Sequence, residues 1–135
     1  MQPTILIVDD SEDDVLLTKL VLARTGRDFR MEVVSSGEDG LALIRGEKTP
    51  PKLILLDLKM HGMDGIEVLR KIREDEVPRS IPVVIVTNSS LESDQQAAFK
   101  AGADSFLQKA TDLNQFKKDI ESVLDRWLGT NLPYL

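Results

Sequence analysis

Five short runs of apolar and β-branched residues recur along the chain, separated by segments with helical periodicity. The runs at 5–8, 53–56 and 83–86 are apolar without alternation, which is typical of strands covered on both faces of a sheet. The runs at 31–34 and 105–108 mix polar with apolar residues, as edge strands do. Strands that alternate with helices predict a parallel sheet with right-handed crossover connections.

Apolar residues at helical spacing predict one helix after each strand. In the first helix, Val15, Leu16, Leu20 and Ala23 form the expected apolar face, and Gly26 can end it. The other four helices are indicated by Leu41 and Ile44, by Ile66, Leu69 and Ile72, by Ala97, Ala98 and Ala101, and by Leu113, Phe116, Ile120, Val123, Leu124 and Trp127.

Placing the three most apolar strands in the centre gives a flavodoxin-like α/β fold, (βα)5, with helices on both faces. Its five-stranded parallel sheet has the strand order 2-1-3-4-5, numbered along the chain. The strand order reverses between the first and third strands, so a ligand is expected at their carboxyl ends.

The composition excludes several kinds of site and partner. The length of 135 residues fits one domain, which we expect over residues 1–128 with a short tail at 129–135. The absence of cysteine excludes disulfides, thiolate zinc sites and cysteine nucleophiles, and the single histidine, His61, excludes a multi-histidine metal centre. Its 17 basic and 23 acidic residues argue against nucleic-acid binding. No apolar run approaches the ~18 residues that span a bilayer, and no signal peptide is evident, so we expect a cytoplasmic protein without a membrane partner.

Three carboxylates are predicted to meet at one edge of the sheet. Asp9 and Asp10 follow the first strand, and Asp57 follows the third. Like charges this close raise one another's pKa unless a cation lies between them. Mg²⁺ prefers such oxygen ligands and is the expected partner. The alternative, that Asp9 and Asp10 only cap the next helix, leaves Asp57 unexplained, because a charge directly after a buried strand is costly.

Two further polar residues end neighbouring strands. Thr87 ends the fourth strand and Lys109 ends the fifth. Each alone is weak evidence, because a threonine there is usually structural and a lysine there is usually solvated. Together with a metal ion and Asp57 they define a site for a tetrahedral dianion. Asp57 is then the expected nucleophile, forming an acyl phosphate.

Several of these segments occur together in one known family. They are residues 5–10 (ILIVDD), 55–60 (LLDLKM), 63–65 (MDG), 86–87 (VT) and 102–109 (GADSFLQK). From about residue 4 to 128 the chain resembles the CheY-like receiver domain of response regulators in two-component signalling. The resemblance implies a phosphoprotein that acts as a switch and promotes its own phosphorylation and dephosphorylation, rather than an enzyme.

The resemblance also implies a metal-assisted phosphoacceptor. Asp57 would take a phosphoryl group from the phosphohistidine of a sensor histidine kinase. Mg²⁺ would be held by Asp10, Asp57 and the backbone carbonyl of Lys59, and Asp9 would assist through water.

Three other residues match the family's phosphate and switch positions. Thr87 and Lys109 would contact the phosphoryl oxygens. Phe106 matches the aromatic residue whose rotamer follows the threonine, although simple packing of an edge strand would also place an aromatic there. Because no residues remain for an output domain, the signal would pass to an unknown downstream protein by contact, or along a phosphorelay.

At two positions the family usually has a proline and this chain does not. Lys109 is followed by Ala110, where the family usually has a proline, often in cis. A cis bond to a non-proline residue costs about 3–4 kcal/mol, so whether this bond is cis stays open. His61 stands in place of the usual proline, and we expect it to be an exposed loop residue rather than a phosphotransfer group.

Residues that flank the site are expected to tune it. Asn88 stands where the family prefers a small residue, and it would either narrow access to Asp57 or hydrogen-bond a phosphate oxygen. Lys59 and Ser89 occupy positions that regulate the access of water in the family. We expect these residues to set the lifetime of the phosphorylated state.

The chain also resembles a narrower group, the stand-alone receivers that accept phosphate from bacteriophytochrome-type kinases. The resemblance rests on residues 79–84 (RSIPVV), 87–90 (TNSS) and 126–134 (RWLGTNLPY). A phytochrome-type kinase is the partner it implies. The apolar residues of the tail would either fold back on the same chain or pack against a second copy as a homodimer, and both stay open.

Two other functions remain alternatives on the sequence alone. A magnesium-dependent phosphohydrolase with an aspartyl nucleophile would carry Asp-x-Asp after the first strand and a cap domain, which this chain lacks. A receiver that binds partners without phosphate would not need the acidic trio, Thr87 or Lys109. A nucleotide-binding domain is disfavoured, because both glycine-rich phosphate loops are absent.

Overall fold

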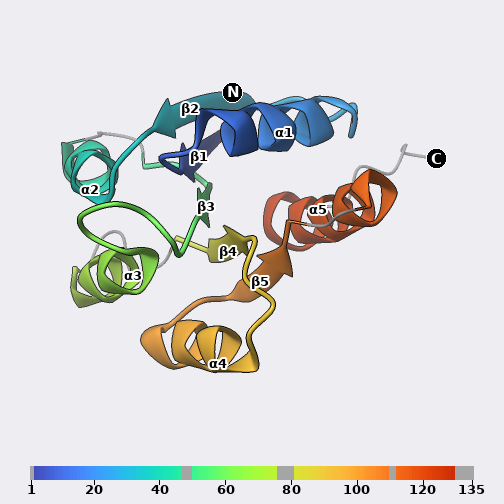
Figure 1. Cartoon of the computed structure of the whole chain (residues 1–135). Coiled ribbons are helices and arrows are strands. Elements are labelled where there is room, and N and C mark those ends of the chain that lie inside the picture. The colour runs from blue at the N-terminus through green and yellow to red at the C-terminus, as the bar shows by residue number, and fades with distance from the viewer. Residues whose placement is uncertain (1, 47–49, 76–80, 110–111, 130–135) are drawn as a thin grey trace.

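A parallel sheet of five strands forms the centre of the protein, in the order β2-β1-β3-β4-β5 (Figure 1). The structure is a computed structural model that describes residues 2–46, 50–75, 81–109 and 112–129. The strands are β1 (Thr4–Val8), β2 (Arg30–Val34), β3 (Leu53–Leu56), β4 (Val83–Thr87) and β5 (Ser105–Gln108). The three apolar runs form the central strands and the two mixed runs form the edges, as predicted, because only central strands are covered on every side.

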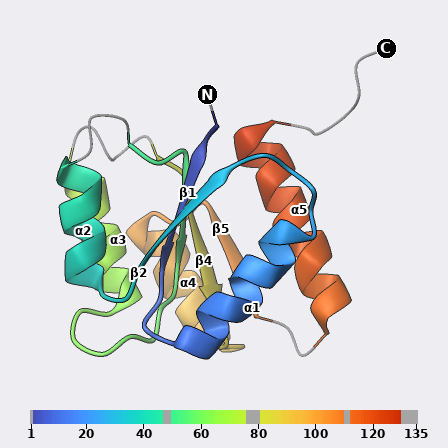
Figure 2. The ribbon, with the colours of Figure 1, turned by 90° about the horizontal axis from the view of Figure 1, so that it is seen from above.

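Five helices cover the two faces of the sheet (Figure 2). α1 (Glu12–Ala23) and α5 (Leu113–Leu128) pack on one face, and α2 (Gly37–Gly46), α3 (Gly65–Glu74) and α4 (Glu92–Ala101) pack on the other. Two apolar cores result, one between each helical layer and the sheet. Among the residues that the structure describes, no helix is long and apolar enough to cross a membrane.

The predicted face of the first helix is wrong at Leu16, Leu20 and Ala23 and right only at Val15, which packs against the core under α1 and α5. Leu16 and Leu20 are 65% and 44% exposed, whereas Val21 and Leu22 are buried in the core under α1 and α5. Apolar residues occupy most of the circumference of this helix, so their spacing does not identify one face. The prediction for α5 is confirmed in its centre, because Phe116 and its apolar neighbours one and two turns on are buried.

The register of the strands brings the polar residues to one edge. In the ladder between β1 and β3, Val8 pairs with Leu56, so Asp57 follows its strand beside the end of β1. The Asp57 N–H donates to the Val8 carbonyl over 3.0 Å. At the other side of the sheet, the Lys109 N–H donates to the Thr87 carbonyl over 2.7 Å.

The start of α3 packs directly against the end of β3 through Gly65. The Gly65 N–H donates to the Leu58 carbonyl over 2.9 Å. A Cβ atom at this position would lie 2.2 Å from the carbonyl oxygen of Asp57, so no residue with a side chain fits without moving the backbone. Glycine at residue 65 therefore fixes the loop beside Asp57.

Some expectations lie outside the described residues. These are the Lys109–Ala110 peptide bond, the beginning of the 79–84 segment, and the tail beyond Gly129 with its two packing alternatives. The apolar residues that precede the tail, Trp127 and Leu128, are partly buried against the core under α1 and α5.

Candidate functional site

Three carboxylates converge at the carboxyl ends of β1 and β3. Asp9, Asp10 and Asp57 each place an oxygen within 4.8 Å of the others, in an arrangement able to hold a metal ion. Asp9 and Asp57 are only 4% and 6% exposed. Three hard oxygen donors at this spacing fit a divalent cation such as Mg²⁺.

Lys109 supplies the positive charge that the buried acids need. Its Nζ lies 2.7 Å from Asp9 Oδ2, 3.0 Å from Asp14 Oδ2 and 3.6 Å from Asp57 Oδ2. Burial alone lowers the pKa of Lys109, but the surrounding carboxylates outweigh it and raise the pKa above its ordinary value. The lysine therefore remains a cation at the centre of the site.

Asp57 is an acid in an unfavourable environment. Its pKa is raised from 3.8 to about 6, chiefly by desolvation and in spite of the charge of Lys109. The Asp9 carboxylate contributes to the increase, whereas the backbone N–H groups of Lys59 and Leu58 oppose it. The folded protein therefore ionises Asp57 less readily than an unfolded chain does, and a cation beside the carboxylate would offset this cost.

Asp10 is held by His61, which lies in the loop after β3. The His61 N–H donates to Asp10 Oδ2 over 2.8 Å, and the ring Nδ1 lies 2.9 Å from the same oxygen. These contacts hold the pKa of Asp10 below its ordinary value. The His61 side chain is otherwise exposed to solvent, as expected, but its contact with Asp10 was not predicted.

The loop after β4 carries two of the expected tuning residues. The Thr87 side chain is fully buried, and its Oγ1 accepts a hydrogen bond from the Ser89 N–H over 3.3 Å. The Asn88 amide donates to Asp14 Oδ2 over 3.1 Å. Asn88 and Lys109 therefore both bind the Asp14 carboxylate at the start of α1.

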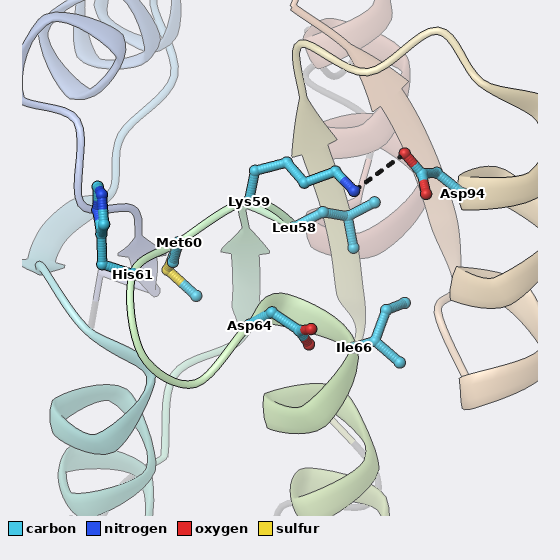
Figure 3. A pocket seen from close by; sticks show the side chains of 7 residues that line it. All are labelled: Leu58, Lys59, Met60, His61, Asp64, Ile66 and Asp94. Carbon is cyan, nitrogen blue, oxygen red and sulfur yellow. Dashed lines mark ion pairs between the residues drawn. The ribbon is translucent and has the colours of Figure 1, made fainter.

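The side chain of Lys59 extends from the loop after β3 to the first turn of α4 (Figure 3). Its Nζ lies 3.4 Å from Asp94 Oδ2. The two side chains border a cavity of about 340 Å³, into which Leu58, Met60 and Ile66 contribute apolar surface. The backbone of Lys59 therefore lies beside Asp57, whereas its ammonium lies at the start of α4.

Phe106 lies on β5, opposite Ile85 of β4. It is half-buried against the core under α2, α3 and α4. It packs as a residue of an edge strand would, and its role as a switch residue stays a prediction.

Two acidic residues of the site were not predicted. Asp14 lies in the first turn of α1 and binds both Lys109 and Asn88. Asp94 lies in the first turn of α4. Both helices begin at the edge of the sheet where the site lies. An acidic residue in the first turn of such a helix is therefore a sequence feature that could have predicted these two residues.

Comparison with known proteins gives the family. Residues 5–121 match the response regulator receiver domain. The chain is 33% identical to the probable methanogenesis regulatory protein FilR2 of Methanothrix harundinacea, over 94% of this chain and 84% of that protein. It is also 33% identical to response regulator Rcp1 of Synechocystis, over 93% of this chain and 89% of that protein.

Solved structures agree over the whole fold. The phosphorylated cyanobacterial phytochrome response regulator RcpA superposes with a TM-score of 0.86 at 28% identity, covering 99% of this chain and all of that one. The Mn²⁺-bound form of Rcp1 gives a TM-score of 0.82 at 31% identity, over 98% of this chain and 99% of that one. The chain therefore belongs to the response regulator receiver domain family, and the predicted flavodoxin-like fold is confirmed.

Proposed function

We propose that this receiver domain is a phosphoacceptor switch in which Asp57 accepts a phosphoryl group from the phosphohistidine of a sensor histidine kinase. The observation that carries the proposal is the convergence of the buried Asp57 carboxylate with Asp9, Asp10 and Lys109. An Asp57 oxygen would attack the phosphorus while the P–N bond breaks and the histidine nitrogen keeps the electron pair. The product is an acyl phosphate on Asp57.

The residues around Asp57 would support this transfer by charge and hydrogen bonding. The Lys109 ammonium, 3.6 Å from Asp57 Oδ2, would bind the phosphoryl oxygens, and the buried Thr87 hydroxyl would donate to them. Phe106 would follow Thr87, so that phosphorylation changes the surface near α4. In this proposal residues 1–128 form the receiver domain and residues 129–135 its tail.

The acidic trio fits a divalent cation, for which we take Mg²⁺. Asp10, Asp57 and the backbone carbonyl of Lys59 would hold it, with Asp9 acting through water. When bound, such an ion supplies positive charge to the phosphoryl group during transfer. The proposal is supported by the carboxylate spacing and by the Mn²⁺-bound structure of Rcp1.

The proposed partner is a phytochrome-type sensor histidine kinase in the cytoplasm. The similarity to the phytochrome response regulator RcpA supports this choice. The chain would act as a switch or phosphorelay intermediate rather than as an enzyme, passing its signal to a downstream protein. The comparisons favour neither the phosphohydrolase nor the phosphate-independent receiver.

Phosphorylation by a small donor tests the proposal directly. The purified protein is incubated with acetyl phosphate and Mg²⁺, and the intact mass is measured. We expect a gain of one phosphoryl group that is absent in Asp57→Asn. Asp13→Asn is the matched control, because Asp13 is an exposed acid on α1.

Three outcomes would count against the proposal. Phosphorylation that persists in Asp57→Asn would move the acceptor elsewhere. Turnover of a phosphate ester without retained mass would favour the hydrolase. An unchanged mass with every donor would favour the phosphate-independent receiver.

A further inference from the structure

We propose that Asp94 is a positioning residue that holds Lys59 and Ser89, the two side chains flanking Asp57, in the resting receiver domain. The inference rests on the proposed function, because the process it regulates is phosphorylation of Asp57. Asp94 does not touch the acidic trio in the structure. It would act by keeping the Lys59 ammonium at α4 and so away from an arriving phosphodonor.

The contacts of Asp94 join two loops on either side of the phosphoacceptor. Its Oδ2 lies 3.4 Å from Lys59 Nζ in the loop after β3 (Figure 3). The same oxygen accepts a hydrogen bond of 2.5 Å from the Ser89 hydroxyl in the loop after β4. One carboxylate oxygen therefore binds both loops.

The chain of contacts continues to the switch threonine. Ser89 Oγ accepts from the Leu91 N–H over 3.2 Å, and the Ser89 N–H donates to Thr87 Oγ1 over 3.3 Å. Any movement of Thr87 toward a phosphoryl group must therefore alter the hydrogen bond that involves Ser89. Asp94 stabilises the resting arrangement of this loop.

The electrostatic consequence concerns Lys59. Its side chain is 67% exposed, and Asp94 is the partner that the structure gives its ammonium. Because residue 59 lies two positions after Asp57, a released Lys59 side chain can reach the space above the phosphoacceptor. A mobile cation there attracts anionic donors and screens the repulsion from the acidic trio.

A structural role of Asp94 in α4 alone is the competing explanation. The N-cap residue of α4, Leu91, makes no side-chain capping bond, and an acid in the first turn stabilises a helix through its dipole. This role does not involve Lys59. The two explanations therefore differ in whether the effect of changing Asp94 depends on the residue at position 59.

The test is a double-mutant cycle on the initial rate of phosphorylation by acetyl phosphate. Asp94→Asn keeps an oxygen that can accept from Ser89 but removes the ion pair with Lys59. We expect it to raise the rate about two- to fivefold, the size typical of a partly exposed ion pair. In a Lys59→Met background the same substitution should leave the rate within about 1.5-fold. Glu92→Gln is the matched control, since Glu92 lies in the same turn and contacts Gln96 instead.

One further readout separates positioning from helix stability, and a second checks that the carboxylate is the group required. The increase should be larger with acetyl phosphate, a dianion at neutral pH, than with phosphoramidate, which carries less net negative charge. Asp94→Glu should restore the wild-type rate, because it restores the carboxylate.

Equal effects of Asp94→Asn in both backgrounds would overturn the inference and leave the proposed function standing. An unchanged rate in Asp94→Asn, with normal phosphorylation of the wild type, would do the same. If the wild-type protein takes no phosphoryl group from either donor, the proposed function itself fails and the inference fails with it.

Discussion

The ammonium of Lys109 and the carboxylate of Asp9 form an almost completely buried ion pair, with Nζ 2.7 Å from Oδ2 and side-chain exposures of 2% and 4%. The distance from the same Nζ to Asp57 is longer, 3.6 Å. In the resting protein, Lys109 therefore lies nearer to Asp9, and to Asp14 at 3.0 Å, than to Asp57. Its ammonium has three hydrogens and is shared among these carboxylates.

Removing the lysine charge should destabilise the metal-free protein strongly. Lys109→Met keeps most of the side-chain volume but leaves Asp9 and Asp57 buried without a cation. Breaking one partner of a buried pair costs about 3–5 kcal/mol, and we expect a loss of this size in the free energy of unfolding by urea at pH 7. Millimolar Mg²⁺ should recover part of it, because a bound cation replaces the missing charge.

An exposed lysine provides the control for this substitution. Lys118 lies on the outer side of α5, so Lys118→Met should change the free energy of unfolding by less than about 0.5 kcal/mol. A Lys109→Met protein as stable as Lys118→Met would show that the buried carboxylates do not depend on the lysine.

Asp57→Asn should stabilise the metal-free protein above pH 6. The pKa of Asp57 is raised from 3.8 to about 6 in the folded state, so between these values the folded protein binds more protons than the unfolded chain. The contribution of Asp57 to the free energy of unfolding therefore falls as the pH rises from about 4 to about 6. The shift corresponds to about 3 kcal/mol when Asp57 is fully ionised, and asparagine avoids this cost.

Urea unfolding across pH gives the measurement for Asp57. In EDTA, the advantage of Asp57→Asn should be small near pH 4 and should grow to about 1–3 kcal/mol at pH 8. Mg²⁺ should reduce the advantage, because only the wild type keeps the full acidic trio. An advantage that is the same at both pH values would contradict the raised pKa.

The sheet and the central residues of the site were predictable from the sequence because both depend on short-range patterns. Apolar runs without alternation identify central strands, and polar residues directly after such runs must lie at their carboxyl ends. Asp9, Asp57 and Lys109 were found in this way, and the structure brings them together.

The partners of long side chains were not predictable in the same way. Lys59 extends to Asp94 in the first turn of α4, and His61 turns back to Asp10, because the path of the loop after β3 decides which acid is within reach. The buried face of α1 was predicted wrongly for a different reason. Leu16 and Leu20 are as apolar as the residues that are buried, so sequence alone does not distinguish the two faces.

Gly65→Ala should destabilise the protein and impair the site. The added Cβ would lie 2.2 Å from the Asp57 carbonyl oxygen and 2.8 Å from the Leu58 Cα, and both are backbone atoms that cannot rotate away. We expect a loss of about 2–4 kcal/mol in thermal or urea unfolding, together with slower phosphorylation. Gly46→Ala is the control, because a Cβ there meets nothing within 4 Å. Equal stability of the two variants would show that α3 moves away from β3 without cost.

The contact between His61 and Asp10 predicts an ordered series of pKa values for Asp10. Hydrogen bonds to the ionised carboxylate lower its pKa, and His61 provides one from the backbone and a second contact from the ring. His61→Ala removes only the ring, whereas His61→Pro also removes the N–H. The pKa of Asp10, measured by NMR titration of the side-chain carboxyl carbon without metal, should therefore rise from wild type to His61→Ala and again to His61→Pro. Asp94, whose pKa is lowered by Ser89 and Lys59 instead, should titrate identically in all three proteins. An Asp10 titration that does not respond to either substitution would mean that the two loops are not in contact in solution.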